Sequence, residues 1–255
     1  MSIETLLSAF PKTRPVLPAE YQAIFEEEYK SNREGTNLMS AAAQKAESWM
    51  HKKVAQKGKE NESVLEIGAG TLNQVKYEKK FATYDIIEPF ENLYKGQDNL
   101  SKVRNVYSDI KDIKSDDQSY DRIISVAVLE HLVELPYSLA RSVILLNKGG
   151  IFQAGLPSEG GFLWGLGWRM TTGLGYYLRN KLSYKVLMEH EHINNIDEIL
   201  AIVKYFFTEV TVQRFPLPGK HFSLYTYVEA KGPDLKRAKA YLETYTAHID
   251  GPKHV

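Results

Sequence analysis

A turn with two glycines follows an apolar run near residue 64. Residues 64–71 read V-L-E-I-G-A-G-T, so Gly68 and Gly70 stand directly after a candidate strand. Glycine lets the backbone approach a ligand closely and take up conformations that a Cβ would block. A dinucleotide fingerprint would place a third glycine where this chain has Asn73. The turn therefore indicates a ligand site that departs from the dinucleotide pattern, unless the glycines only form a tight strand-to-helix turn.

Two acidic residues follow the next two candidate strands. Glu88 ends the second strand, and Asp109 lies just after the third. A carboxylate at the position of Glu88 can accept hydrogen bonds from both ribose hydroxyls of an adenosyl ligand. Asp109 can accept a hydrogen bond from the exocyclic amine of an adenine in the same crevice. The alternative for both residues is a role as surface caps.

Histidines recur farther along the chain. The fourth candidate strand ends in S-V-A-V-L-E-H-L, which carries Ser125 and His131 to the carboxyl edge of the sheet, where α/β proteins bind ligands. A second cluster, H-E-H, contains His190 and His192 and is followed by Asn194. It lacks a third or fourth metal ligand nearby, so we expect no metal and a hydrogen-bonding or proton-accepting role. The alternative for His131 is that it begins a helix and bonds to the backbone.

The segment between residues 157 and 195 reads as an insertion that fits neither the helix nor the strand period. It combines aromatic with cationic side chains: Trp164, Trp168, Tyr176, Tyr177, Arg169, Arg179, Lys181 and Lys185. Aromatic faces stack on rings and guanidinium groups bind phosphate, so the mixture suits a sugar joined to phosphate. The same residues could instead form the small core and solvated face of a lid, or an interfacial helix at a membrane.

Short apolar runs, which we interpret as strands, are separated by stretches long enough to form a helix. These strands and helices must position the candidate site residues. Five such runs cover residues 64–67, 83–88, 103–107, 121–126 and 150–155. Strands that are apolar on both faces and alternate with helices form parallel sheets covered on both sides. Residues 209–215 and 222–230 lie too close for a crossover helix and are expected to form an antiparallel hairpin. Pro136 suits the first turn of a helix that Gly149 and Gly150 would end.

The chain is expected to form one α/β domain with attachments. Residues 1–60 would form a helical N-terminal collar with a break near Gly35, and residues 61–156 the ligand-binding core. Residues 157–195 would form an insertion that binds the substrate. Residues 196–255 supply a helix, the hairpin and a terminal amphipathic helix.

Composition excludes several classes of protein. Of 255 residues, 43% are hydrophobic and 25% charged, which argues against a disordered, fibrous or membrane-embedded chain. The 32 basic side chains balance the 32 acidic ones, so no overall field exists to hold a nucleic acid. Cysteine is absent from the sequence, which excludes disulfides and favours the cytoplasm. We expect neither a secretory signal nor a membrane-spanning segment.

From Val64 to Ala230 the chain resembles the class I S-adenosylmethionine-dependent methyltransferases in its glycine turn, its strand-end acids and their order. The resemblance implies a doubly wound, Rossmann-like, seven-stranded sheet with an antiparallel C-terminal hairpin. It also implies S-adenosylmethionine as cofactor and S-adenosylhomocysteine as product. One departure is Leu72, where many members have another glycine. The implied cofactor residues are Glu66, Gly68 and Gly70 at the methionine part, Glu88 at the ribose, Asp109 at the adenine and Ser125 at the sulfonium.

A narrower resemblance concerns the acceptor. The N-terminal run Y-K-S-N-R-E-G, the insertion and the E-P after the second strand are similar to methyltransferases encoded with bacterial capsule and O-antigen synthesis. This implies O-methylation of a sugar hydroxyl, on a nucleotide-linked or glycan sugar of a surface polysaccharide. The expected acceptor-binding residues are Tyr29, Arg33, Trp168, Arg169, Arg179 and Asn194. The candidates for a general base are His131, His190 and His192.

Several alternatives stay open. A nucleotide-sugar enzyme that uses a nicotinamide dinucleotide is disfavoured by Asn73 and by the lack of a Y-x-x-x-K pair in a suitable helix. A methyltransferase for a small molecule or a lipid fits the same residues, as does a non-catalytic adenosyl-binding partner of another enzyme. We expect a small-molecule or sugar acceptor and no nucleic acid. Peripheral membrane contact through the insertion is left open.

Overall fold

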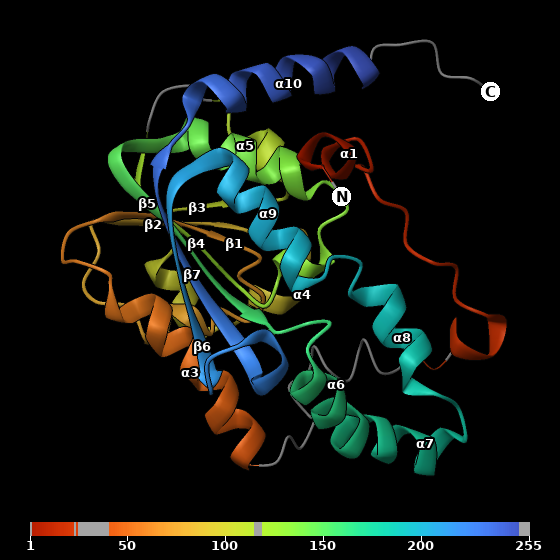
Figure 1. Ribbon diagram of the computed structural model, residues 1–255. Helices are drawn as coiled ribbons and strands as arrows, with labels where there is room; N and C mark the ends of the chain where they lie inside the picture. Colours follow the sequence, from red (N-terminus) through yellow and green to blue (C-terminus); the bar gives the residue numbers. More distant parts are fainter. Residues whose placement is uncertain (1, 23, 25–40, 115–118, 250–255) are drawn as a thin grey trace.

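A seven-stranded mixed sheet forms the centre of the protein (Figure 1). The computed structural model describes residues 2–22, 24, 41–114 and 119–249. The strand order is β3-β2-β1-β4-β5-β7-β6, in which β7 is antiparallel to both neighbours and the other pairs are parallel. The strands are β1 Ser63–Ile67, β2 Thr83–Ile87, β3 Asn105–Tyr107, β4 Tyr120–Val126, β5 Leu146–Pro157, β6 Phe207–Pro216 and β7 Ser223–Pro233. The predicted fold with its antiparallel C-terminal hairpin is confirmed.

Alternating residues of β1 and β4 build two cores, one on each face of the sheet. Leu65 and Ile123 belong to the first core, whereas the adjacent Val64 and Ile124 belong to the second. All four are buried, so both faces of these strands carry apolar side chains. A sheet that is apolar on both faces requires helices on both sides.

Helices from both halves of the chain cover these faces (Figure 1). The first core is covered by α1 Ile3–Leu7, α5 Leu135–Leu145, α9 Ile196–Phe206 and α10 Leu235–Ile249. The helix α3 Ala41–Gln56 covers the second core with Met50 and Val54. The short helix α4 Glu91–Tyr94 follows β2. Within the described residues, no helix is both long and apolar enough to cross a membrane.

The junction between α5 and β5 differs from its prediction. Pro136 lies in the first turn of α5 as expected, but the helix ends at Leu145 and β5 begins at the next residue. Gly149 and Gly150 therefore lie inside β5 instead of ending the helix. They occupy an irregularity of the ladder, because Tyr120 pairs with Leu146 while Arg122 already pairs with Ile151. Gly149 has a φ of +81°, a conformation that favours glycine in such a bulge.

The N-terminal collar is described only in part. It contains α1, a turn of helix at residues 19–22 and α3. The predicted break near Gly35 and the predicted acceptor residues Tyr29 and Arg33 lie outside the described residues.

The insertion is helical, although the spacing of its apolar residues fitted neither a helix nor a strand. It consists of α6 Phe162–Trp168, a π-helical turn Arg169–Gly173, α7 Leu174–Asn180 and α8 Tyr184–Glu191. Its buried side is small, because Tyr176 and Leu187 pack against Leu17 and Tyr21 of the N-terminal segment. Other apolar residues of α6 and α7 are exposed, among them Phe162, Leu174 and Leu178, and this arrangement hides the period of the helices.

Candidate active site

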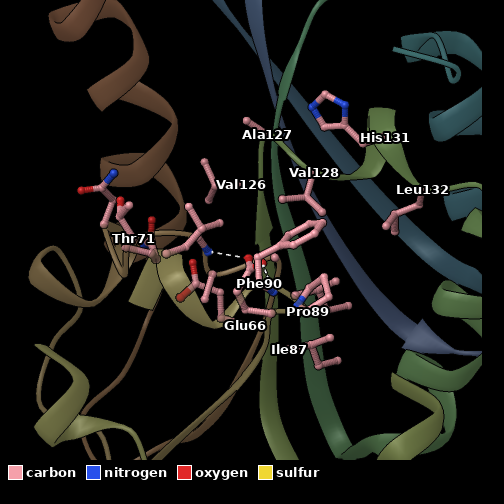
Figure 2. Close-up of a pocket in the computed structure, with 18 of the residues that line it drawn as sticks. Glu66, Thr71, Ile87, Pro89, Phe90, Val126, Ala127, Val128, His131 and Leu132 are labelled. Carbon is pink, nitrogen blue, oxygen red and sulfur yellow. Dashed lines mark hydrogen bonds between the residues drawn. The ribbon is translucent and has the colours of Figure 1, made fainter. Parts of the chain in front are cut away.

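A cavity of about 810 Å³ lies at the carboxyl ends of the parallel strands (Figure 2). One part of its wall follows β1, β2 and β3, and includes Glu66, Gly68, Gly70, Glu88, Pro89, Phe90 and Asp109. The rest of the wall comes from the N-terminal segment, α3, the loop after β4 and α8, and includes Arg14, Glu47, His51, His131, His190 and Glu191. Predicted cofactor residues and two predicted bases thus line the same cavity.

The glycine turn after β1 has the backbone that its composition indicated. Gly68 and Gly70 have φ values of +73° and +51°, in the left-handed region that favours glycine. A Cβ on Gly68 would lie 2.3 Å from the Val128 side chain, whereas a Cβ on Gly70 would meet no atom within 4 Å. The backbone at Gly70 therefore faces open space. Leu72 is fully buried and has a φ of +59°, so the departure from glycine leaves the left-handed turn in place.

Glu88 connects the end of β2 to this turn. One carboxylate oxygen accepts a hydrogen bond from the Gly70 backbone N–H at 2.8 Å, and the other accepts one from the Phe90 N–H at 3.0 Å. The side chain is only 5% exposed. Each oxygen keeps a further lone pair, so the carboxylate can still accept hydrogen bonds from a diol in the cavity.

Asp109 caps the short helix that follows β3. Its side chain accepts a hydrogen bond from the Lys111 backbone N–H at 2.8 Å, and Asp112 accepts one from the Asp109 N–H at 2.9 Å. The surface-cap role considered for Asp109 is therefore real. The residue also lines the cavity, beside Ser108 and Ile110, so capping does not remove it from the site.

Glu66 is a buried acid at the base of the cavity. The Tyr84 hydroxyl donates a hydrogen bond to its carboxylate at 2.7 Å. Burial raises the pKa of Glu66 to about 8, and the nearby carboxylates of Glu78 and Glu88 act in the same direction. At neutral pH its carboxyl group is therefore largely protonated until a cation comes near.

Ser125 lies one residue too early to line the cavity. Its side chain is fully buried in β4, and its hydroxyl donates a hydrogen bond to the Ile67 carbonyl at 3.2 Å. The cavity wall is formed instead by Val126, Ala127 and Val128. Side chains alternate along a strand, so a shift by one residue exchanges a wall position for an interior one. The structure thus gives Ser125 a place between strands, away from the expected sulfonium region.

Two histidines line the cavity opposite the cofactor residues. His131 Nδ1 lies 2.9 Å from the Glu191 carbonyl, and His190 Nδ1 lies 2.7 Å from the Pro15 carbonyl. A carbonyl only accepts, so each Nδ1 carries the proton and each neutral ring keeps Nε2 as the basic nitrogen. Both residues have the tautomer that a general base requires.

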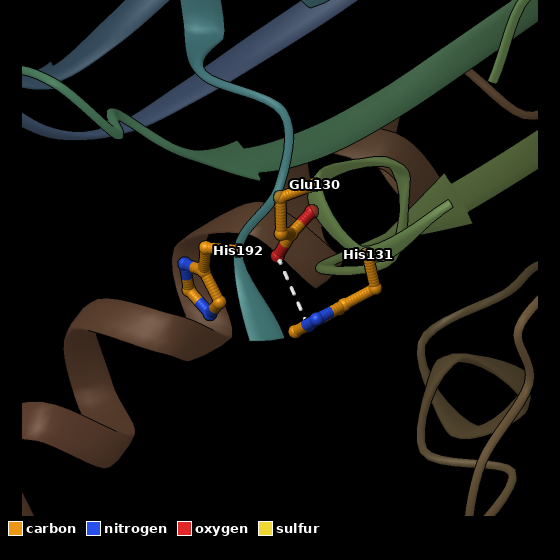
Figure 3. A group of neighbouring side chains, drawn as sticks. All are labelled: Glu130, His131 and His192. Carbon is orange, nitrogen blue, oxygen red and sulfur yellow. Dashed lines mark ion pairs between the residues drawn. The ribbon is translucent and has the colours of Figure 1, made fainter. Parts of the chain in front are cut away.

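His192 belongs to a different group of side chains (Figure 3). Its Nδ1 lies 2.9 Å from a carboxylate oxygen of Glu159, and its ring meets the His131 ring edge-on at 4.8 Å between centroids. Glu130 lies beside both histidines and is buried. Burial raises the pKa of Glu130.

Arg14 is a site residue that the sequence did not reveal. Its guanidinium donates hydrogen bonds to three backbone carbonyls, those of His190, Glu191 and His131, at 2.9, 3.0 and 2.8 Å. It thereby ties the end of α8 to the loop after β4. Nothing in its local sequence, K-T-R-P, marks it, because its partners are more than 100 residues away. Glu47 and His51 of α3 were missed as well, and the His51 ring meets Gln74 at 2.7 Å, a contact between two elements that the local sequence does not show.

Asn194 supports this loop from inside. Its side chain is fully buried, and its amide donates hydrogen bonds to the Leu129 and Leu132 carbonyls at 2.9 and 2.8 Å. Its backbone N–H bonds to the Glu130 carbonyl at 3.0 Å. These contacts make Asn194 a positioning residue for the loop that carries His131, in place of the predicted acceptor contact.

The predicted acceptor residues of the insertion lie away from the cavity wall. The Arg169 guanidinium stacks on the Trp168 ring, 4.6 Å from its centroid. Arg169 and Arg179 are exposed on the helices of the insertion. The structure therefore groups these residues on the insertion itself, whereas Arg14, His131 and His190 line the cavity.

Residues 65–154 match the family model described as a methyltransferase domain. This range contains the glycine turn, the acids after β2 and β3, and the loop with His131. The chain thus contains a methyltransferase domain, and its cofactor is S-adenosylmethionine. The carboxylates that line the cavity fit that cofactor, because Glu88 and Asp109 can accept hydrogen bonds from a ribose diol and an adenine amine. Open space at Gly70 leaves room for the ligand beside the backbone.

Solved structures share the fold of the methyltransferase. An S-adenosylmethionine-dependent methyltransferase from Thermotoga maritima superimposes with a TM-score of 0.54 at 16% identity, covering 81% of this chain and 96% of the other. The plantazolicin methyltransferase BamL superimposes with a TM-score of 0.57 at 12% identity, covering 91% of this chain and 100% of the other. The 1,6-didemethyltoxoflavin-N1-methyltransferase of Burkholderia thailandensis gives 0.54 at 18% identity, covering 88% and 93%. A search of the curated proteins finds no significant match.

Proposed function

We propose that this methyltransferase transfers a methyl group to a sugar hydroxyl, on a nucleotide-linked or glycan sugar of a bacterial surface polysaccharide. S-adenosylmethionine supplies the methyl group on a sulfonium, which is already an activated donor. The observation that carries the proposal is the shared cavity of cofactor residues and basic histidines. An alcohol is a poor nucleophile, so its methylation benefits from a base, whereas a neutral amine needs none before attack.

The protein contributes position and a proton acceptor. Holding an acceptor oxygen in line with the leaving group can supply about 7–11 kcal/mol of the barrier. His131 and His190 each present a basic Nε2 on the acceptor side of the cavity, and a base there contributes typically about 10²–10⁴-fold in rate. Arg14 fixes the backbone that carries both histidines, and thereby their distance from the cofactor side.

The outer face of the insertion supports an acceptor that is carried on a lipid. Phe162 and Met170 of the insertion are each 67% exposed, and Leu174 and Leu178 continue the same apolar face. From residue 160 to residue 188 the sequence contains four Lys or Arg and no Asp or Glu. An apolar face flanked by cations is the pattern of a helix that lies on an anionic membrane. We propose that the enzyme works in the cytoplasm, at the membrane surface where such acceptors are held.

A panel of acceptors tests the proposal. The enzyme is incubated with S-adenosylmethionine and with nucleotide sugars, lipid-linked sugars, or small amines and phenols, and products are identified by mass spectrometry. We expect one added methyl group on a sugar hydroxyl. Solved structures of similar fold include N- and C-methyltransferases, so acceptors with reactive nitrogen and carbon atoms belong in the panel. Methylation confined to nitrogen or carbon would refute the proposal.

A further inference from the structure

Three side chains with metal-binding atoms meet beside the cavity. Glu130 and His131 lie in the loop after β4, and His192 lies at the end of α8, so the sequence separates them by about 60 residues. One ligand atom from each lies within 4.8 Å of the other two (Figure 3). Of the H-E-H cluster only His192 belongs to this group, and the distant loop supplies the other two candidate ligands.

Both imidazoles are oriented as metal ligands usually are. The Nδ1 of His131 is held by the Glu191 carbonyl at 2.9 Å, and the Nδ1 of His192 is held by the Glu159 carboxylate at 2.9 Å. Each ring therefore keeps the lone pair of Nε2 free for a ligand. A histidine that binds a metal almost always donates its other N–H to a carboxylate or a carbonyl in this way.

Glu130 carries a buried carboxylate oxygen without a hydrogen-bond partner in the described part of the chain. Its side chain is almost completely buried, at 2% exposed, and no group in the described part of the chain donates a hydrogen bond to its Oε2. The other carboxylate oxygen, Oε1, lies 3.8 Å from His131 Nε2. A buried carboxylate oxygen without a donor is costly, and a bound cation removes that cost.

We propose that Glu130, His131 and His192 bind one divalent transition metal ion of the zinc type. Two imidazoles and one carboxylate form a ligand set that zinc uses in open catalytic sites, whereas magnesium and calcium prefer oxygen ligands alone. Tetrahedral ligand atoms around zinc lie roughly 3.4 Å apart, so the three side chains need to close by about 1 Å on binding. A zinc ion with three protein ligands keeps an open coordination position, and of the three ligands His131 also lines the cavity.

The role of the ion in catalysis rests on the proposed function. An acceptor hydroxyl at the open position would become more acidic, and its proton would pass to His190 Nε2. The acceptor oxygen then forms the new bond to the methyl carbon while the carbon–sulfur bond breaks, which leaves a neutral thioether. This division of roles makes His131 a metal ligand and His190 the proton acceptor.

Zinc binding to the full chain tests the site without any acceptor. Protein cleared of metal with a chelator is titrated with ZnCl₂ by calorimetry, and Co²⁺ loading is followed by its visible absorption. We expect one ion per chain and nitrogen–oxygen coordination of low symmetry. Glu130→Gln and His192→Ala should each lower the zinc affinity about 100-fold or more, since even outer partners of metal ligands contribute 10–100-fold.

The matched control is His221→Ala, an exposed histidine in the turn before β7. It should bind zinc like the parent, and all three variants should bind S-adenosylhomocysteine, which shows that they fold. Zinc binding that is absent from the parent, or equal in the parent, Glu130→Gln and His192→Ala, overturns the proposal. Zinc binding by a protein that methylates no sugar would confirm the metal site and refute the proposed acceptor instead.

Discussion

Glu88 accepts a hydrogen bond from the backbone N–H of Gly70 at 2.8 Å, which fastens the end of β2 to the glycine turn after β1. The same carboxylate holds the Phe90 N–H at 3.0 Å. The residue expected to bind the ribose therefore also shapes the loop expected to bind the methionine part. Loss of this one side chain should disturb both halves of the cofactor site.

Glu88→Ala should weaken S-adenosylhomocysteine binding strongly. Each hydrogen bond to a charged group contributes about 1.5–3 kcal/mol, so loss of one of them predicts a decrease of roughly 10-fold to 150-fold in affinity, and loss of both predicts a larger one. Calorimetry measures it, with Glu91→Ala as the control because Glu91 is exposed on α4. Equal affinities for Glu88→Ala and the parent would show that the ribose is bound elsewhere.

His190→Ala should separate catalysis from cofactor binding. His190 lines the cavity and is not among the predicted cofactor residues. We expect kcat to fall by about 10²–10⁴-fold because a general base is lost, while the Kd for S-adenosylhomocysteine stays unchanged. Steady-state kinetics and calorimetry together measure the split. A variant that keeps full kcat on its acceptor would assign the proton transfer to another group.

Glu66 should make the stability of the protein depend on pH. Burial raises the pKa of Glu66 from 4.5 to about 8, so between these values the folded state holds a proton that the unfolded state has released. The free energy of unfolding of the parent should therefore fall, relative to Glu66→Gln, by about 1.4 kcal/mol per pH unit over this window and level off above it. Urea unfolding at pH 5, 6, 7 and 8 measures the difference. A difference that is constant across these pH values would contradict a raised pKa.

The outer face of the insertion should bind anionic membranes. Met170 is 67% exposed on this face, so Met170→Glu places a negative charge where apolar contact with lipid is expected. We expect the parent to co-sediment with phosphatidylglycerol-containing vesicles and the variant to bind several-fold less. Val16→Glu is the control, because Val16 is 88% exposed outside the insertion and gives the same change in charge. If Met170→Glu and Val16→Glu bind vesicles alike, the face has another role.

The local sequence was sufficient to predict which residues line the cavity where a residue's position depends only on its own strand and the turn that follows it. Gly68, Gly70 and Glu88 follow buried strands, and parallel strands bring their carboxyl ends together, so strand order alone placed them in one cavity. Ser125 shows the limit of this reasoning, since a shift by one position changes the face of a strand. The functions of these residues stay predictions, whereas the fold, the activity class and the cofactor are confirmed.

Residues that depend on distant contacts could not be found from the sequence. Arg14 reaches backbone carbonyls in two other segments, and its own neighbours carry no motif. Glu130 and His192 come together only when α8 packs against the loop after β4. The insertion hid its helices because its apolar residues face outward as well as inward. In each case the deciding interaction is tertiary, and a single sequence carries no direct signal of it.

A crystal structure with S-adenosylhomocysteine bound tests the central claim most directly. The account predicts that the ligand fills the cavity at the strand ends, with both ribose hydroxyls in hydrogen-bonding distance of Glu88, the adenine beside Asp109 and the sulfur directed toward His131 and His190. A ligand bound at this edge of the sheet without contact to Glu88, or bound outside the cavity, would contradict it.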